Sequence, residues 1–187
     1  IASGSRAQKG RVWFEDKAHG LTAGIWEAEA NATHWMDYPV NEFMLVLEGA
    51  VTIVEDHGST TVKAGESFIL PKGLRCRWTQ EGLVRKFFVI FDDASGLVNQ
   101  APLHAITIDP DVKLAPSTPP SPAVLLSPVP TQHAHDCFED ATGQFSIGIW
   151  DTTPYHRKLI DFPRHELMHL LEGSVTFTGD KGRSQTF

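Results

Sequence analysis

The sequence predicts an all-β protein that contains two copies of one domain. Short apolar and β-branched runs, such as LTAGIW and RKFFVIF, alternate with turn signals rich in Gly, Asp and Pro, and no stretch keeps a helical period. Residues 13–58 also align without a gap with residues 137–182, at the offset that brings Gly24 onto Gly148. Because a one-residue slip turns every strand side chain to the opposite face, this match predicts the same fold in both copies. Many short strands are typical of a sandwich or barrel.

The first copy, residues 1–95, carries the complete series of strand signals. Its most informative element is NEFMLVLEG at 41–49, where Glu42 alternates with Met44 and Val46 on one strand face. The opposite face is apolar as well, so we expect the strand to be covered on both sides and the carboxylate to be enclosed. An enclosed carboxylate needs a proton or a partner.

Residues 96–132 form a proline-rich connection, and residues 133–187 form the second copy. Proline has no N–H for a β-ladder, so the connection is expected to be an extended strap, and its apolar side chains predict that packing keeps it ordered. The second copy reaches Phe187, which aligns with Lys63, and therefore lacks the C-terminal strands of the first. We expect either that this sequence is a fragment or that another chain completes the second barrel.

The composition restricts the possible partners. The formal net charge of -7 disfavours nucleic acid and anionic membranes, because both bind basic surfaces. The sequence has neither a long apolar run nor a signal-peptide pattern. Two cysteines, Cys76 and Cys137, cannot form a disulfide framework. These features predict a cytoplasmic protein that binds a small molecule.

Two motifs resemble the cupin superfamily. Glu42 to Gly49 matches the end of the first cupin motif, E-x6-G, and GESFILPKG, from Gly65 to Gly73, matches the second, G-x5-P-x-G. The segments LEGAVTI and VRKFFVI resemble those of the DUF861 (cupin_3) branch. This branch includes ureidoglycine aminohydrolases and ethanolamine-utilisation cupins. The resemblance implies tandem RmlC-like jelly-roll barrels, the second incomplete in this chain. It also implies an intramolecular pseudo-dimer of the barrels, with further homo-oligomers as an open alternative.

The metal ligands that this resemblance implies are mostly absent. Cupin metal sites typically take two histidines, as H-x-H, before the glutamate and a third after P-x-G. Here those places hold Met36, Tyr38 and Cys76 in the first copy, and Ile160 and Phe162 in the second. We therefore expect no metal cofactor. The alternative is a divalent metal on one of two residue sets, His34 with Glu42 and Cys76, or His165 with Glu166 and His169.

We predict a metal-free pocket in the first barrel for a small polar or anionic metabolite. Its predicted residues are Glu42, Tyr38, Cys76, Arg77, Trp78 and Met44, with Glu166, Phe162 and Met168 as counterparts in the second barrel. Under the resemblance, Arg75 and Arg77 lie on a strand beside Glu42, so we expect an arginine to pair with it. Alternatively, Glu42 only satisfies an arginine or backbone donors inside a core, and Cys76 is an inert buried thiol.

Two further functions stay open at this point. One is a metal-dependent enzyme, similar to an aminohydrolase or isomerase, that acts on a ureido, amino or sugar-like substrate. The other is a non-catalytic sensor or scaffold. The fold alone does not choose among them, because one fold hosts many chemistries. The sequence leaves open whether the protein is an enzyme.

Overall fold

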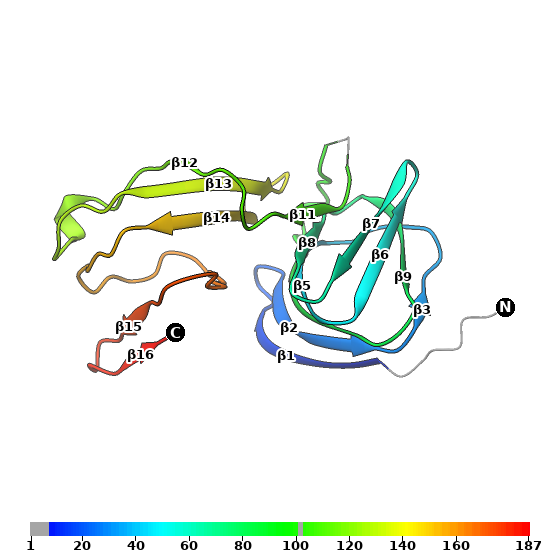
Figure 1. The fold of residues 1–187 in the computed structure, drawn as a ribbon, viewed down its shortest axis with the longest axis horizontal. Coiled ribbons are helices and arrows are strands. Elements are labelled where there is room, and N and C mark those ends of the chain that lie inside the picture. The colour runs from blue at the N-terminus through cyan, green and yellow to red at the C-terminus, as the bar shows by residue number, and fades with distance from the viewer. Residues whose placement is uncertain (1–7, 101–102) are drawn as a thin grey trace. The chain divides into compact units, whose positions relative to one another are not determined.

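The computed structural model describes residues 8–100 and 103–187 and divides the chain into two compact units (Figure 1). The first unit comprises the chain up to Asp109 together with Asp136–Ile147, and the second comprises Pro110–His135 and Gly148–Phe187. Within the described residues, the only helical element is the 3-10 helix η1 (Pro122–Val124), which confirms the all-β prediction. No helix in these residues is long and apolar enough to cross a membrane.

The first unit is built from two antiparallel sheets that surround a common interior (Figure 1). The six-stranded sheet has the order β1 (Gln8–Asp16), β2 (Leu21–Ala28), β10 (Val84–Phe91), β5 (Asn41–Glu48), β8 (Ser67–Leu70) and β11 (Ile106–Ile108). The five-stranded sheet contains β3 (Asn31–Ala32), β9 (Arg75–Gln80), β6 (Ala50–Glu55) and β7 (Gly58–Lys63), and β4 (Met36–Asp37) also pairs with β9.

The alternation of side chains along these strands creates the core. On β5, Met44 and Val46 are buried, and on β9, Cys76 and Trp78 are buried, while their neighbours in sequence point to the other face. These side chains belong to one hydrophobic cluster that both sheets supply. The barrel interior is therefore the core of the unit, and any polar group placed there must find its partners inside.

The final glycines of the two motifs have positive φ angles, which explains why the motifs require glycine. Gly49, at φ 80°, turns the chain from β5 into β6. A Cβ atom at Gly49 would lie 2.0 Å from the carbonyl oxygen of Leu83. Gly73, at φ 92°, makes the turn before β9. Both positions lie in the region of φ that favours glycine.

Part of the predicted linker and part of the second copy belong to the first unit. Ile106 in β11 pairs with Ile69 of β8, so the linker adds a strand to the six-stranded sheet. Phe145 stacks on Phe91 with ring centroids 5.6 Å apart, and the Ala141 backbone N–H donates to the side chain of Asn99 at 2.9 Å. These residues of the linker and of the second copy therefore pack within the first unit.

The repeat reappears as matching hairpins in the second copy. A three-stranded sheet contains β12 (Ala115–Pro116), β13 (Gln132–Glu139) and β14 (Ser146–Thr152), and a two-stranded sheet contains β15 (Thr176–Thr178) and β16 (Ser184–Thr186). In the repeat register, β13 and β14 take the places of β1 and β2, and β15 and β16 lie within those of β6 and β7. The two copies thus form corresponding local pairings.

Residues 158–174, all of which the structure describes, form no strand and are mostly exposed. They include the counterpart of β5. In the first copy, β5 pairs with β10 on one side and with β8 on the other. At the repeat offset, β8 and β10 have no counterparts among the described residues. Its described residues belong to no strand, and the Lys158 backbone N–H donates instead to the Val124 carbonyl oxygen at 2.9 Å.

Candidate functional site

A buried ion pair lies in the interior of the first unit. Glu42 on β5 and Lys86 on β10 both point into the barrel, because they share strand faces with Met44 and Phe88. The two residues are only 5% and 7% exposed. Charged side chains are rarely this buried unless they are paired.

Both carboxylate oxygens of Glu42 have a partner. The Nζ atom of Lys86 donates to Glu42 Oε1 at 2.8 Å, and the Tyr38 hydroxyl donates to Oε2. The same Nζ atom also reaches the Sδ atom of Met44 at 2.9 Å. The carboxylate is therefore held between one cationic and one neutral donor, so each of its oxygens has a hydrogen-bond partner.

Two indole rings complete the surroundings of the Lys86 ammonium. Its Nζ atom lies 4.7 Å from the ring centroid of Trp78 and 5.2 Å from that of Trp26. The two rings are nearly perpendicular, at 84°, with centroids 6.0 Å apart. Both distances are within the range of a cation–π contact, which gains strength where water is excluded.

Neutral hydrogen bonds fix the orientation of Trp78. Its indole N–H donates to Gln80 Oε1 at 2.7 Å. The Gln80 amide in turn donates to the backbone carbonyl oxygens of Ala28, at 2.7 Å, and Glu29, at 2.9 Å. Gln80 is itself buried, so these bonds join the β2 end of the barrel to the ring that covers the ammonium. Such supporting bonds make a polar centre rigid.

The neighbouring titratable groups stay neutral at physiological pH. Burial raises the pKa of Tyr38 well above its usual value, and the adjacent negative charge of Glu42 raises this pKa further. Burial also raises the pKa of the Cys76 thiol to about 11, with smaller contributions from Glu55 and Asp37. Tyr38 is thus a hydrogen-bond donor, and Cys76 lacks the thiolate that a nucleophile needs.

The structure brings five of the six predicted pocket residues to the barrel interior and separates the sixth. Tyr38, Met44, Cys76 and Trp78 belong to or pack against the same cluster that surrounds Glu42. Arg77 alternates with Cys76 and Trp78 on β9 and therefore lies on the opposite sheet face.

Lys86, and not an arginine, is the cation bonded to Glu42. Arg75 and Arg77 lie over the ring of Trp35, with guanidinium carbons 5.7 and 5.9 Å from its centroid. Lys86 was not among the residues predicted from the sequence, although a signal for it was present. In RKFFVIF, a period of two places Lys86 on the same face as Phe88, so a lysine in the middle of an apolar strand could have been considered as a partner.

The donor groups do not fit a divalent metal ion. Over the parts of the chain that the structure describes, no three His, Cys, Asp or Glu side chains form a group that could hold one. His34, from the first alternative set, is exposed. The carboxylate of Glu42 already accepts from an ammonium at 2.8 Å, and a divalent ion bound to the same carboxylate would be repelled by that charge. The second set, His165, Glu166 and His169, is exposed in the segment without strands.

The second-copy counterparts do not form an enclosed site. Glu166 is exposed, and Phe162 and Met168 are 44% and 41% exposed. All three lie in residues 158–174, which form no strand. Glu166 is therefore exposed, in contrast to Glu42, which is buried.

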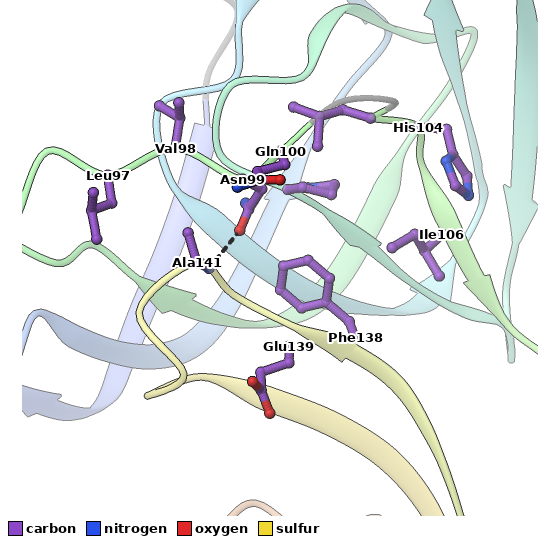
Figure 2. Close-up of a pocket in the computed structure, with 11 residues that line it drawn as sticks. Leu97, Val98, Asn99, Gln100, His104, Ile106, Phe138, Glu139 and Ala141 are labelled. Carbon is purple, nitrogen blue, oxygen red and sulfur yellow. Dashed lines mark hydrogen bonds between the residues drawn. The ribbon is translucent and has the colours of Figure 1, made fainter.

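A separate hollow of about 480 Å³ lies at the surface of the first unit (Figure 2). Its lining is mainly apolar and includes Leu97, Val98, Leu103, Ile106 and Phe138. The polar atoms of Asn99 in this lining are already bonded, to Asn41 at 2.7 Å and to the Ala141 backbone at 2.9 Å. The hollow does not include the Glu42 cluster, so the barrel interior is the better candidate site.

The fold and its interior define a cupin barrel whose motif glutamate is paired with an ammonium group. Residues 15–88 match the model of the EutQ-like cupin domain, Cupin_3. A solved structure of a DUF861-family protein of unknown function from Pseudomonas syringae pv. tomato is 32% identical, with a TM-score of 0.81, and the match covers 94% of this chain and 73% of that one. The chain belongs to the DUF861 family, which confirms the resemblance found in the motifs.

Other solved structures are more distant. The Clostridium difficile EutQ protein is 19% identical over 47% of this chain and 70% of its own, with a TM-score of 0.41. A cupin-2 domain containing protein from Shewanella frigidimarina is 21% identical over 43% of this chain and 78% of its own, with a TM-score of 0.38. No curated protein matches this chain.

Proposed function

We propose that the first barrel binds a small polar or anionic metabolite in its interior without a metal ion. The ligand contacts the charged and hydroxyl groups of Tyr38, Glu42 and Lys86 directly. The observation that supports this is the ion pair between Glu42 and Lys86, enclosed by the rings of Trp26 and Trp78. A cytoplasmic location is part of the proposal and rests on the cysteine content of the sequence.

The energetics of the ion pair favour a functional role. A buried pair of charges is expensive to desolvate, and well-packed apolar residues of the same volume often give equal or greater stability. A core that needed only stability could therefore use apolar side chains at these positions. Polar groups that converge on an apolar interior are instead typical of a ligand site, since they orient the ligand.

A metabolite panel in a thermal-shift assay tests the proposal. A ligand of the barrel should raise the unfolding temperature of the full chain in proportion to log concentration, because it binds only the folded state. The rise should disappear in Tyr38→Phe and persist in Arg77→Ala, since Arg77 lies on the outer sheet face. If every ligand that stabilises the protein acts equally on Tyr38→Phe, the barrel interior is not the binding site.

Metal analysis separates this proposal from a metal-dependent enzyme. Freshly purified protein should contain no stoichiometric Zn, Mn, Fe or Ni. A stoichiometric metal that is lost in Glu42→Ala would overturn the metal-free proposal, because Glu42 would then be a metal ligand. Arg77→Ala serves as the control variant in this measurement as well.

A further inference from the structure

The surroundings of Lys86 have the composition of a binding site for an ammonium group. The Nζ atom is in contact with one carboxylate oxygen, at 2.8 Å, and one thioether sulfur, at 2.9 Å. Two indole faces lie within 5.2 Å of it. Carboxylates and tryptophan faces are the groups that recognise alkylammonium ions.

We infer that the interior of this barrel is a primary ammonium site, which the chain's own Lys86 occupies. This inference deepens the proposed function and rests on its metal-free centre. It narrows the ligand class to polar molecules with a primary ammonium group, which compete with Lys86 for Glu42 and the indole faces, and it excludes anionic metabolites that carry no ammonium group.

The charges of the centre support an ammonium ion over other ligands. Only one carboxylate faces the site, which matches a single positive charge, and the indole faces attract cations and repel anions. A neutral hydroxyl in the place of Nζ would leave the negative charge of Glu42 uncompensated. A divalent ion needs several good ligands, and the described groups around Nζ offer one carboxylate, one neutral phenol and one thioether.

The resident lysine explains how a cation site can exist inside a folded core. Its side chain reaches the centre from β10, and only 9% of that side chain is exposed. The tethered ammonium competes intramolecularly with any free ammonium compound, so the intact site binds such compounds only when Lys86 is displaced. Removing the lysine side chain should therefore expose a site of the same chemistry.

Chemical complementation of Lys86→Ala tests this inference in the full chain. The substitution removes Cγ, Cδ, Cε and Nζ, which are the heavy atoms of n-propylammonium. Adding n-propylammonium chloride should raise the unfolding temperature of the variant by roughly 3 °C or more, and the rise should continue with the logarithm of its concentration. At equal concentration and ionic strength, 1-propanol and sodium propanoate should produce no such rise. The double variant Lys86→Ala/Glu42→Gln should not respond, and the wild-type protein should respond more weakly than Lys86→Ala at every concentration, because its own Lys86 competes.

The possible outcomes have distinct meanings. An ammonium-specific rise that grows with log concentration and depends on Glu42 supports the inference. No rise, an equal rise with 1-propanol, or an equal rise in the wild-type protein would overturn it. If no metabolite of the panel stabilises the protein while n-propylammonium binds Lys86→Ala, the proposed function is wrong and the ammonium site is supported. If panel ligands without an ammonium group bind through Tyr38, the ammonium assignment falls and the proposed function stands.

A measurement on the wild-type protein covers the case in which Lys86→Ala does not fold. Reductive methylation followed by mass spectrometry compares Lys86 with Lys9, whose side chain is 78% exposed. An ammonium held by Glu42 and two indole rings should be modified at least about tenfold more slowly, because methylation needs the free amine in contact with solvent. Equal modification rates of the two lysines would overturn the inference.

Discussion

Substitution of Lys86 by methionine should destabilise the protein by about 3–5 kcal/mol, the usual cost of breaking a buried ion pair from one side. Methionine has a similar length and no charge, so it preserves volume and removes only the ammonium. At a separation of 2.8 Å, the Coulomb attraction is about 6 kcal/mol at an effective dielectric constant of about 20. Part of this lost attraction is offset, because the variant no longer has an ammonium group that must lose its hydration on folding.

Urea unfolding at pH 7, followed by tryptophan fluorescence, measures the loss. The double variant Lys86→Met/Glu42→Gln should recover most of it, because no charge is then left unpaired in the core. Lys9→Met is the matched control, since the pair of Lys9 with Glu27, at 3.3 Å, lies at the surface with side chains 78% and 29% exposed. The free energy of unfolding of Lys9→Met should fall by no more than about 1 kcal/mol.

Two results would refute the reasoning. One is a loss below about 1 kcal/mol for Lys86→Met, comparable to the surface control. The other is simple additivity, in which the double variant loses the sum of the two single losses, because residues in contact should couple by about 0.5–3 kcal/mol. Either result would mean that Lys86 and Glu42 do not form a buried pair in solution.

Further predictions concern residues other than Glu42 and Lys86. Tyr38→Phe leaves Glu42 Oε2 without its donor and should cost about 1–3 kcal/mol in the same urea assay; an unchanged midpoint would contradict this hydrogen bond. Gly49→Ala should destabilise by at least about 1 kcal/mol, because its Cβ would strike the Leu83 carbonyl, whereas alanine at the open turn of Gly58 should be milder. At pH 8, iodoacetamide should label Cys137 well before Cys76, whose pKa is raised to about 11; equal native rates would contradict its burial. Because this raised pKa favours the neutral thiol in the fold, its contribution to stability is present below about pH 9 and lost as the pH rises through 11. A plot of Tm against pH should therefore flatten in Cys76→Ala over this range.

The sequence predicted the barrel well because its signals are local. The alternation around Glu42 fixes which side chains of β5 enter the core, and the structure buries Met44 and Val46 as that pattern requires. The motif glycines likewise mark turns whose backbone needs a positive φ, as Gly49 shows. Each of these features depends on a few neighbouring residues, and can therefore be recognised without a structure.

The partner of Glu42 could not be fixed in the same way, because it depends on the pairing of distant strands. Lys86 lies 44 positions further along the chain, on a strand that the motifs do not cover. Arg77 lies closer to the second motif and was the more obvious cation. The period of two on β9 places it outside, and the choice between two cations follows only once the register of β10 against β5 is known.

The two copies also differ in sequence at the ion-pair position. In the repeat register, Trp150 matches Trp26, and Met168 matches Met44, but Phe162 takes the place of Tyr38. A phenylalanine cannot donate to the second carboxylate oxygen, so Glu166 lacks one of the two partners of Glu42 whatever strands surround it. An enclosed Glu166 would then need a different donor or a proton. The two glutamates therefore have different chemistry, and the centre that could hold an ammonium group belongs to the first copy.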